Sequence, residues 1–134
     1  MITNQGSVRR EVVIDAGAEE LWAIVGDPGR VQEWFPGIES SHLEGTARTI
    51  TLSSGQVVTE TIVTRDPLQR RLQYSSDGPM CRRHLATLDV VPIDEGRCLV
   101  VFGTDAEPAA SALALGGAAG AALENLARRF EEAR

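Results

Sequence analysis

The chain has 134 residues, a length that suits one domain, and its 43% hydrophobic and 24% charged residues are typical of a globular protein. The net charge is −6, and arginine doublets such as Arg70-Arg71 and Arg82-Arg83 are isolated rather than gathered in a stripe. A nucleic-acid partner is therefore not expected, because phosphate contacts need a clustered positive surface.

Neither a membrane span nor a secretion signal is expected. The longest apolar stretch, Ala109 to Leu123, consists mostly of Ala and Gly and is too weakly hydrophobic for a transmembrane helix. Residues 1–8 are polar and contain no apolar signal-peptide core. We therefore expect a cytoplasmic protein without integral membrane association, and we treat residues 1–134 as a single domain because no repeat or linker interrupts them.

Sequence motifs for metals, cofactors and nucleophiles are absent. Cys81 and Cys98 lack the C-x-x-C spacing, so we expect two reduced thiols. His42 and His84 are the only imidazoles, and their separation in the predicted sheet argues against a metal site. No phosphate loop, dinucleotide fingerprint or G-x-S-x-G elbow occurs. We expect no cofactor.

The chain begins with a strand and two short helices. Residues 8–15 alternate between apolar and polar side chains, which indicates a strand. Residues 18–25 place Leu21, Trp22 and Val25 on one helical face. After the breaker at residues 26–29, a second short helix is predicted over residues 30–35.

Residues 38–105 are predicted to form six strands. This segment is rich in Thr, Val, Ile and Leu, and turn signals recur along it at regular spacing. These signals are Gly45, Ser53-Ser54-Gly55, Asp66-Pro67, Asp77-Gly78-Pro79 and Asp94-Glu95-Gly96. Consecutive strands with short turns form an antiparallel meander.

The last segment is predicted to be a long helix that begins near Pro108. One stripe of it carries Leu113, Gly116, Gly120, Leu123, Ala127 and Phe130. The expected fold is therefore an α+β helix-grip, in which a seven-stranded curved antiparallel sheet wraps around the C-terminal helix and two short helices follow strand 1.

The side chains predict a cavity between the sheet and the long helix. Even-numbered strand positions are mostly apolar and odd-numbered positions are more polar, so the even-numbered side should face the helix. Residues 116–121 of that helix are all Gly or Ala. Glycine inside a helix is unfavourable, and the run is explained either by close approach of the helix to the sheet or by space for a ligand.

Polar residues interrupt the apolar face at even positions, including His42 and Thr104. Turns centred on Pro67 and Pro79 would place Glu60, Tyr74 and His84 in one row across three strands. A buried carboxylate is costly, so Glu60 should be hydrogen-bonded or have a raised pKa. The row could stabilise the sheet, orient polar atoms of a ligand, or transfer protons.

The predicted cavity residues come from the even strand positions, the first helix and the inner stripe of the last helix. They are Trp22, Ile38, His42, Ile50, Leu52, Val58, Glu60, Ile62, Leu72, Tyr74, His84, Leu88, Val100, Phe102, Leu113, Gly116 and Gly120.

The order of motifs resembles the SRPBCC superfamily, which includes START lipid-transfer domains and bacterial polyketide cyclase/dehydrase proteins. The similarity lies in Val12–Ala16 with Glu20-Leu21-Trp22, in Trp34–Ile38, in Val58–Glu60 with Asp66-Pro67 and Arg71–Tyr74, and in Leu123–Leu126. The resemblance implies a deep apolar cavity under the last helix, with Glu60, Tyr74 and His84 facing it. The position that matches a cavity lysine of the related plant hormone receptors is Glu39 or Ser40, which does not favour an acidic ligand.

Three functions remain open at this point. The first is binding or carriage of a small hydrophobic molecule such as a lipid or polyketide. The second is a polyketide cyclase/aromatase-type enzyme whose candidate catalytic residues are His84, Glu60 and Tyr74, with His84 the preferred base by its ordinary pKa. The third is a protein-interaction module of co-chaperone type that uses Leu85, Leu99 and Val101 on the odd face.

Overall fold

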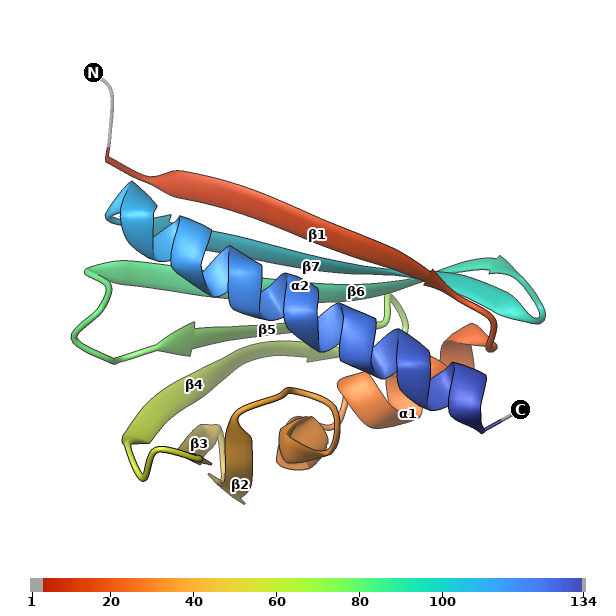
Figure 1. The fold of residues 1–134 in the computed structure, drawn as a ribbon, viewed down its shortest axis with the longest axis horizontal. Helices are drawn as coiled ribbons and strands as arrows, with labels where there is room; N and C mark the ends of the chain where they lie inside the picture. The colour runs from red at the N-terminus through yellow and green to blue at the C-terminus, as the bar shows by residue number, and fades with distance from the viewer. Residues whose placement is uncertain (1–3, 134) are drawn as a thin grey trace.

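The computed structural model describes residues 4–133, and Figure 1 shows one curved sheet crossed by a long helix. A strand and two short helices open the fold, six strands follow, and the long helix closes it. The elements are β1 (Gly6–Ile14), α1 (Ala18–Val25), η1 (Pro28–Glu33), β2 (Ile38–Glu44), β3 (Ala47–Leu52), β4 (Val57–Asp66), β5 (Arg71–Ser76), β6 (Arg83–Asp94), β7 (Arg97–Glu107) and α2 (Ala109–Glu132).

The seven strands form a single antiparallel sheet in the order β1-β7-β6-β5-β4-β3-β2. The first strand pairs with the last, and the other strands follow one another as a meander. Each predicted turn signal coincides with a connection between strands, and Gly45 and Gly55 adopt the positive φ that such turns need. The predicted helix-grip fold is confirmed.

The even-numbered side of the strands faces inward, as the alternation predicts. Along β7, for example, Cys98, Val100, Phe102 and Thr104 are buried while their odd neighbours are half-buried. The core continues into Leu72, Leu88 and Val90 of the central strands and into Trp22 and Trp34 beside them. Burial on one face only is the expected result of side chains that alternate with period two.

The long helix lies to one side of the sheet. It packs mainly against β1 and β7, and it runs along β1 in Figure 1. A Cβ atom added at Gly116 would lie 2.6 Å from Cγ1 of Val8, and one added at Gly120 would lie 3.3 Å from Cδ of Arg10. These glycines therefore allow the helix backbone to approach β1 closely, which leaves most of the inner face of β3, β4 and β5 uncovered by α2.

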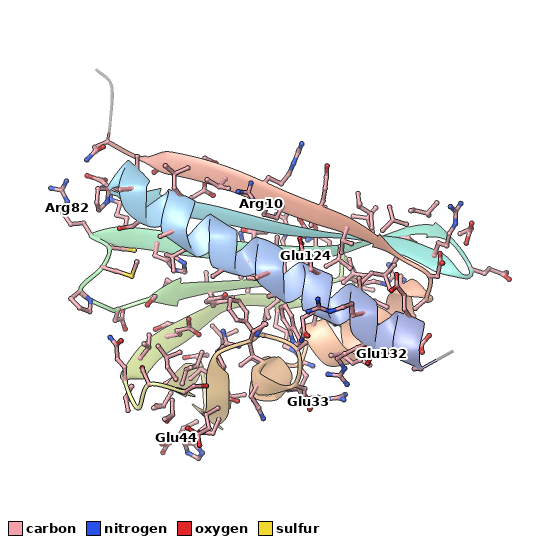
Figure 2. All side chains as sticks on the ribbon, viewed as in Figure 1. Arg10, Glu33, Glu44, Arg82, Glu124 and Glu132 are labelled. Atoms are coloured by element: carbon pink, nitrogen blue, oxygen red, sulfur yellow. The ribbon has the colours of Figure 1, made fainter. Side chains whose placement is uncertain are left out.

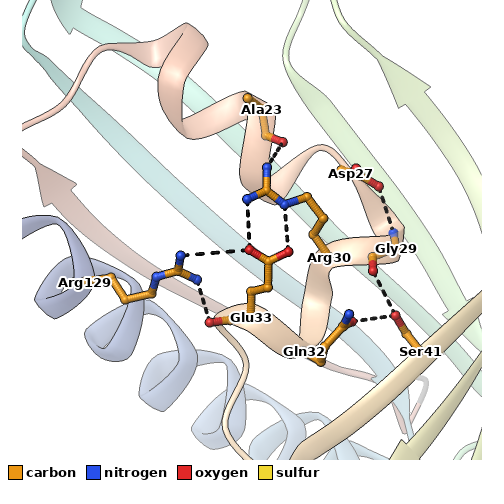
Figure 3. Close-up of polar contacts among 8 residues, drawn as sticks. All are labelled: Ala23, Asp27, Gly29, Arg30, Gln32, Glu33, Ser41 and Arg129. Carbon is orange, nitrogen blue, oxygen red and sulfur yellow. Dashed lines mark hydrogen bonds and ion pairs between the residues drawn. The ribbon is translucent and has the colours of Figure 1, made fainter. Parts of the chain in front are cut away.

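A polar network joins η1 to the C-terminal half of α2 (Figure 3). Glu33 receives two hydrogen bonds from Arg30, at 2.8 and 2.9 Å, and its backbone carbonyl accepts one from Arg129 of α2 at 2.6 Å. On the other side of η1, the hydroxyl of Ser41 in β2 contacts Gly29 and Gln32. The network ties η1 to both the helix and the edge of the sheet.

Charged side chains surround this framework. Figure 2 shows Glu44 and Arg82 at the periphery of the sheet and Glu132 at the end of α2. Among residues 4–133, neither helix has both the length and the apolarity required to cross a bilayer.

Candidate functional site

A cavity of about 780 Å³ occupies the uncovered part of the inner face. Its walls come from β3 to β7, from the segment between η1 and β2, and from Leu115 and Ala118 of α2. Several residues that line it, including Ser53, Gln56, Met80 and Ala118, are exposed, so the cavity opens to solvent. A largely apolar hollow of this size with a few polar groups is the usual form of a small-molecule site.

Eight of the predicted cavity residues line this space. They are Ile38, Ile50, Leu52, Val58, Glu60, Tyr74, His84 and Phe102. Thr104, noted as an inward-facing polar residue, lines it as well. The structure therefore brings the three candidate catalytic residues to a common cavity.

The other predicted residues lie elsewhere. Trp22, Leu72, Leu88 and Val100 are buried in the solid core, and Ile62 packs against it. Their inward direction agrees with the alternation, but other side chains fill the space in front of them. Because they lie toward the end of the sheet that α1 and η1 cover, they contribute packing rather than cavity wall.

On α2, the inner stripe follows β1 instead of the cavity. Leu113 is 65% exposed, and Gly116 and Gly120 face Val8 and Arg10 of β1. Close approach therefore accounts for these two glycines, whereas Leu115 and Ala118 are the helical residues that reach the cavity.

His42 points to solvent because the register of β2 shifts between Ile38 and Ser40. Such a bulge reverses which side chains face inward. Ser41 takes the inner position, where its hydroxyl bonds to Gly29 and Gln32. His42 is therefore not part of the cavity.

A buried ion pair forms the polar centre of the cavity wall. Arg48 of β3 lies directly opposite Glu60 of β4, and the two side chains are 1% and 10% exposed. The guanidinium donates to Oε1 of Glu60 from Nε at 2.9 Å and from Nη2 at 2.6 Å, and Nη1 donates to the carbonyl of Pro28 at 3.0 Å. The pair is thus anchored to η1.

Burial raises the pKa of the Glu60 carboxyl above its ordinary value, and the charge and hydrogen bonds of Arg48 oppose that rise. Glu60 therefore satisfies both parts of the expectation for a buried carboxylate: it is hydrogen-bonded and its pKa is raised. A carboxyl of this kind is suited to hold or release a proton in a cavity.

Tyr74 joins this pair to His84. The guanidinium carbon of Arg48 lies 4.6 Å from the centre of the Tyr74 ring, which is a cation–π contact, and the rings of Tyr74 and His84 are 5.9 Å apart. Burial, together with the negative charge of Glu60, raises the pKa of the Tyr74 hydroxyl. Tyr74 is therefore a neutral phenol at physiological pH.

His84 is held by the backbone of the neighbouring strand. Its Nδ1 accepts a hydrogen bond from the backbone N–H of Ser76 at 2.9 Å. Burial lowers the pKa of the imidazole, and this hydrogen bond acts in the same direction because it needs an unprotonated Nδ1. The nitrogen that could serve as a base is thus already occupied, which argues against the preferred role of His84 as a base.

The predicted row of three residues is wrong in register. Glu60 pairs with Ser76, not Tyr74, and Tyr74 pairs with Ala86, not His84. The turns are centred later than Pro67 and Pro79, and β4 has a bulge between Ile62 and Thr64. Both pairings are displaced by two residues, and an even displacement keeps the side chains on the same face.

Sequence reasoning missed Arg48, which is the counter-ion of Glu60. The signal was present: Arg48 shares the even numbering of Ile50 and Leu52, and the turn at residues 53–56 places it opposite Glu60. An arginine at an inward position opposite an inward glutamate predicts a buried ion pair.

The proposed protein-interaction surface and the possibility of a metal site can both be compared with the structure. Leu85, Leu99 and Val101, proposed for a protein-interaction surface, are half-buried. Within the range 4–133, no group of three His, Cys, Asp or Glu side chains is arranged so that it could hold a metal ion.

Solved structures with the same fold cover nearly the whole chain. An uncharacterized protein from Bacillus thuringiensis matches with a TM-score of 0.87 at 21% identity, covering 93% of this chain and 98% of its own. The Zhui aromatase/cyclase from Streptomyces sp. R1128 matches with a TM-score of 0.77 at 18% identity, covering 95% and 94%. Norcoclaurine synthase from Thalictrum flavum, in complex with dopamine and hydroxybenzaldehyde, matches with a TM-score of 0.75 at 18% identity, covering 97% and 88%.

At the level of sequence, the curated proteins contain no match. Residues 5–131 do match the family described as polyketide cyclase/dehydrase and lipid transport. That match spans almost the entire chain, and the curved sheet, long helix and cavity agree with it. The chain belongs to the polyketide cyclase/dehydrase and lipid transport family, an SRPBCC-type family of the helix-grip fold.

Proposed function

We propose that this protein binds a small hydrophobic molecule in the cavity between its sheet and α2. The observation that carries the proposal is the cavity of about 780 Å³, whose apolar wall includes Ile50, Leu52 and Phe102. Burial of apolar ligand surface there would contribute roughly 25 cal/mol per Å² before the costs of association. The chain belongs to a family whose description includes lipid transport, and this supports the same function.

Substitution of one cavity residue on α2 tests this proposal. Ala118 lines the cavity, whereas Ala114, one turn earlier, is exposed and does not. Nile red, a neutral apolar dye, should bind the unsubstituted protein and Ala114→Trp equally. Ala118→Trp should bind it at least about tenfold more weakly, because the indole occupies ligand space. Equal binding by all three proteins would place the dye outside the cavity and contradict the proposal.

A second candidate function is acid–base catalysis of cyclisation, and Glu60 is the observation that favours it. Its carboxyl is buried, lines the cavity and has a raised pKa. Glu60 would remove a proton from carbon between two carbonyls, the enolate carbon would attack a third carbonyl, and the proton would return to the new alkoxide.

The test is ring formation from a poly-β-keto thioester of N-acetylcysteamine, followed by absorbance. Glu60→Gln should lower the rate by at least about a hundredfold while the variant stays folded. This candidate function is contradicted if Glu60→Gln forms the ring as fast as the unsubstituted protein does. It is also contradicted if the unsubstituted protein forms the ring no faster than the reaction without protein.

A further inference from the structure

The imidazole of His84 presents one defined hydrogen-bond donor to the cavity. Because Nδ1 accepts from the backbone N–H of Ser76, the proton of the neutral ring lies on Nε2. Nε2 has no hydrogen-bond partner among residues 4–133. It is not buried either, because the buried side-chain atom without a partner in that range is Nε1 of Trp34. The Nε2–H group is therefore an accessible donor on a residue that lines the cavity.

Glu60 presents an acceptor near this donor. Both hydrogen bonds from Arg48 end on Oε1, and no donor in the described part of the chain bonds to Oε2. Oε2 is also not one of the buried side-chain atoms that lack a hydrogen-bond partner, so this oxygen is accessible from outside the protein interior. Glu60 pairs with Ser76, the same residue of β5 that bonds to His84, so acceptor and donor lie on either side of one strand.

The charges along the wall determine which head groups can bind. Arg48 is neutralised by Glu60 at 2.6 Å, and Asp77 adds a further negative charge. No uncompensated cation remains among the described residues that line the cavity. An anionic head group would lose water there without gaining an ionic partner, which is strongly unfavourable.

We infer that the cavity selects an uncharged apolar molecule with a carbonyl-type oxygen, which accepts from Nε2–H of His84, and a hydroxyl group, which donates to Oε2 of Glu60. The inference rests on the proposed binding function and deepens it, because it specifies the polar chemistry of the ligand. The inference predicts that neutral oxygenated molecules bind more tightly than fatty-acid-like anions of equal length.

The first experiment measures displacement of Nile red at pH 7.5 by undecan-2-one, undecanoate and undecane. The ketone should bind at least about tenfold more tightly than the carboxylate. His84→Phe should weaken ketone binding about three- to tenfold relative to undecane binding in the same variant, since it removes a single hydrogen bond. His42→Phe is the matched control, because His42 is exposed and should change neither ligand.

A second variant tests the charge argument. Glu60→Gln removes one negative charge beside Arg48, so the preference for ketone over undecanoate should fall at least about threefold. Nitrogen-15 NMR of the unsubstituted protein gives an independent readout, in which Nδ1 of His84 should be unprotonated and Nε2 protonated. This measurement does not depend on how either variant folds.

The outcomes distinguish this inference from the binding proposal. If Nile red and undecane bind and Ala118→Trp abolishes their binding, the binding function stands. The inference is then overturned by undecanoate binding as tightly as the ketone, by unchanged ketone binding in His84→Phe, or by a proton on Nδ1. If no apolar probe binds in the cavity, the binding proposal itself fails.

Discussion

At the scale of single residues, the cavity wall combines charge and apolar surface through one ion pair. Arg48 and Glu60 are both buried, and removing two charges from water costs several kcal/mol per ion. Their direct hydrogen bonds and the bond from Arg48 to Pro28 offset that cost. Each of the two charges is therefore tolerated in the interior only while the other is present.

The substitution Arg48→Met should therefore lower the free energy of unfolding by about 3–5 kcal/mol, because it leaves the Glu60 carboxylate buried without a counter-ion. The double variant Arg48→Met/Glu60→Leu should recover most of this loss. Urea denaturation at pH 7 measures both values. A loss below about 1 kcal/mol in the single variant, or equal losses in both, would show that the pair is not coupled in this way.

Protonation of His84 should make the protein less stable in mild acid. Since its pKa is lowered in the folded state, the unfolded chain binds more protons between that lowered pKa and about pH 6.5. The contribution of His84 is therefore fully present above about pH 6.5 and is lost as the pH falls. The ring of Tyr74, 5.9 Å from that of His84, and the charged or titratable groups that line the same cavity, namely Arg48, Glu60, Asp77 and Cys81, are the same in a His84→Phe variant.

Urea denaturation between about pH 8 and pH 5.5 can isolate this effect. The stability of the unsubstituted protein relative to His84→Phe should decline toward acid, and His42→Phe controls for loss of an exposed imidazole. A difference that stays constant with pH, or grows in acid, would contradict a lowered pKa.

At the scale of elements, the position of α2 explains why there is a cavity. The sequence alone left close approach and ligand space as alternative explanations for the small residues of this helix. The structure combines them: Gly116 and Gly120 bring α2 against β1, and the displaced helix leaves the inner face of β3 to β5 open. The helix is thus positioned by its contact with an edge strand.

Two adjacent glycines provide a matched test. Gly116→Ala should destabilise the protein, because the new Cβ would lie 2.6 Å from Cγ1 and 3.0 Å from Cβ of Val8, and a valine has little freedom to move aside. Gly117→Ala meets no atom within 4 Å and should stabilise by up to about 1 kcal/mol through helix propensity.

Thermal unfolding would show the opposite shifts, and Val8→Ala should reduce the effect of Gly116→Ala. Stabilisation by both alanines would mean that α2 does not approach β1 this closely.

Sequence reasoning predicted the elements more accurately than their register. Alternation identified the inner face, and Gly45 and Gly55 marked turns where positive φ is needed. Proline was a poor guide to turn centres, because the β4–β5 connection runs on to Arg70, which itself has positive φ. Register also shifts at bulges in β2 and β4, and in β2 the inward residue after the bulge, Ser41, bonds to Gly29 of η1, a long-range contact that no local pattern reveals. The bulge in β2 explains why His42 was misplaced, and the later turn centres together with the bulge in β4 explain why the polar row was displaced.

At the scale of the whole molecule, the same fold contains a solid core and a hollow end. Phe102, Trp34 and Phe35 pack together where η1 approaches the sheet, with ring centres 5.8 to 6.2 Å apart. Beyond Phe102 the interior opens, and small residues such as Ala86 line the space. Protein interiors are normally close-packed, so a ligand bound in this cavity would fill the space that side chains leave open there.

Ligand binding should therefore stabilise the folded protein as a whole. A ligand that binds the folded state alone adds RT ln(1 + [L]/Kd), which is about 2.7 kcal/mol at a hundredfold excess over Kd. Undecan-2-one should raise the unfolding temperature of the unsubstituted protein and of Ala114→Trp, and the rise should grow with the logarithm of its concentration. Ala118→Trp fills part of the same cavity and should show little response. A rise of equal size in Ala118→Trp would mean that the ketone stabilises through the protein surface, and the hollow end would then have no role in binding.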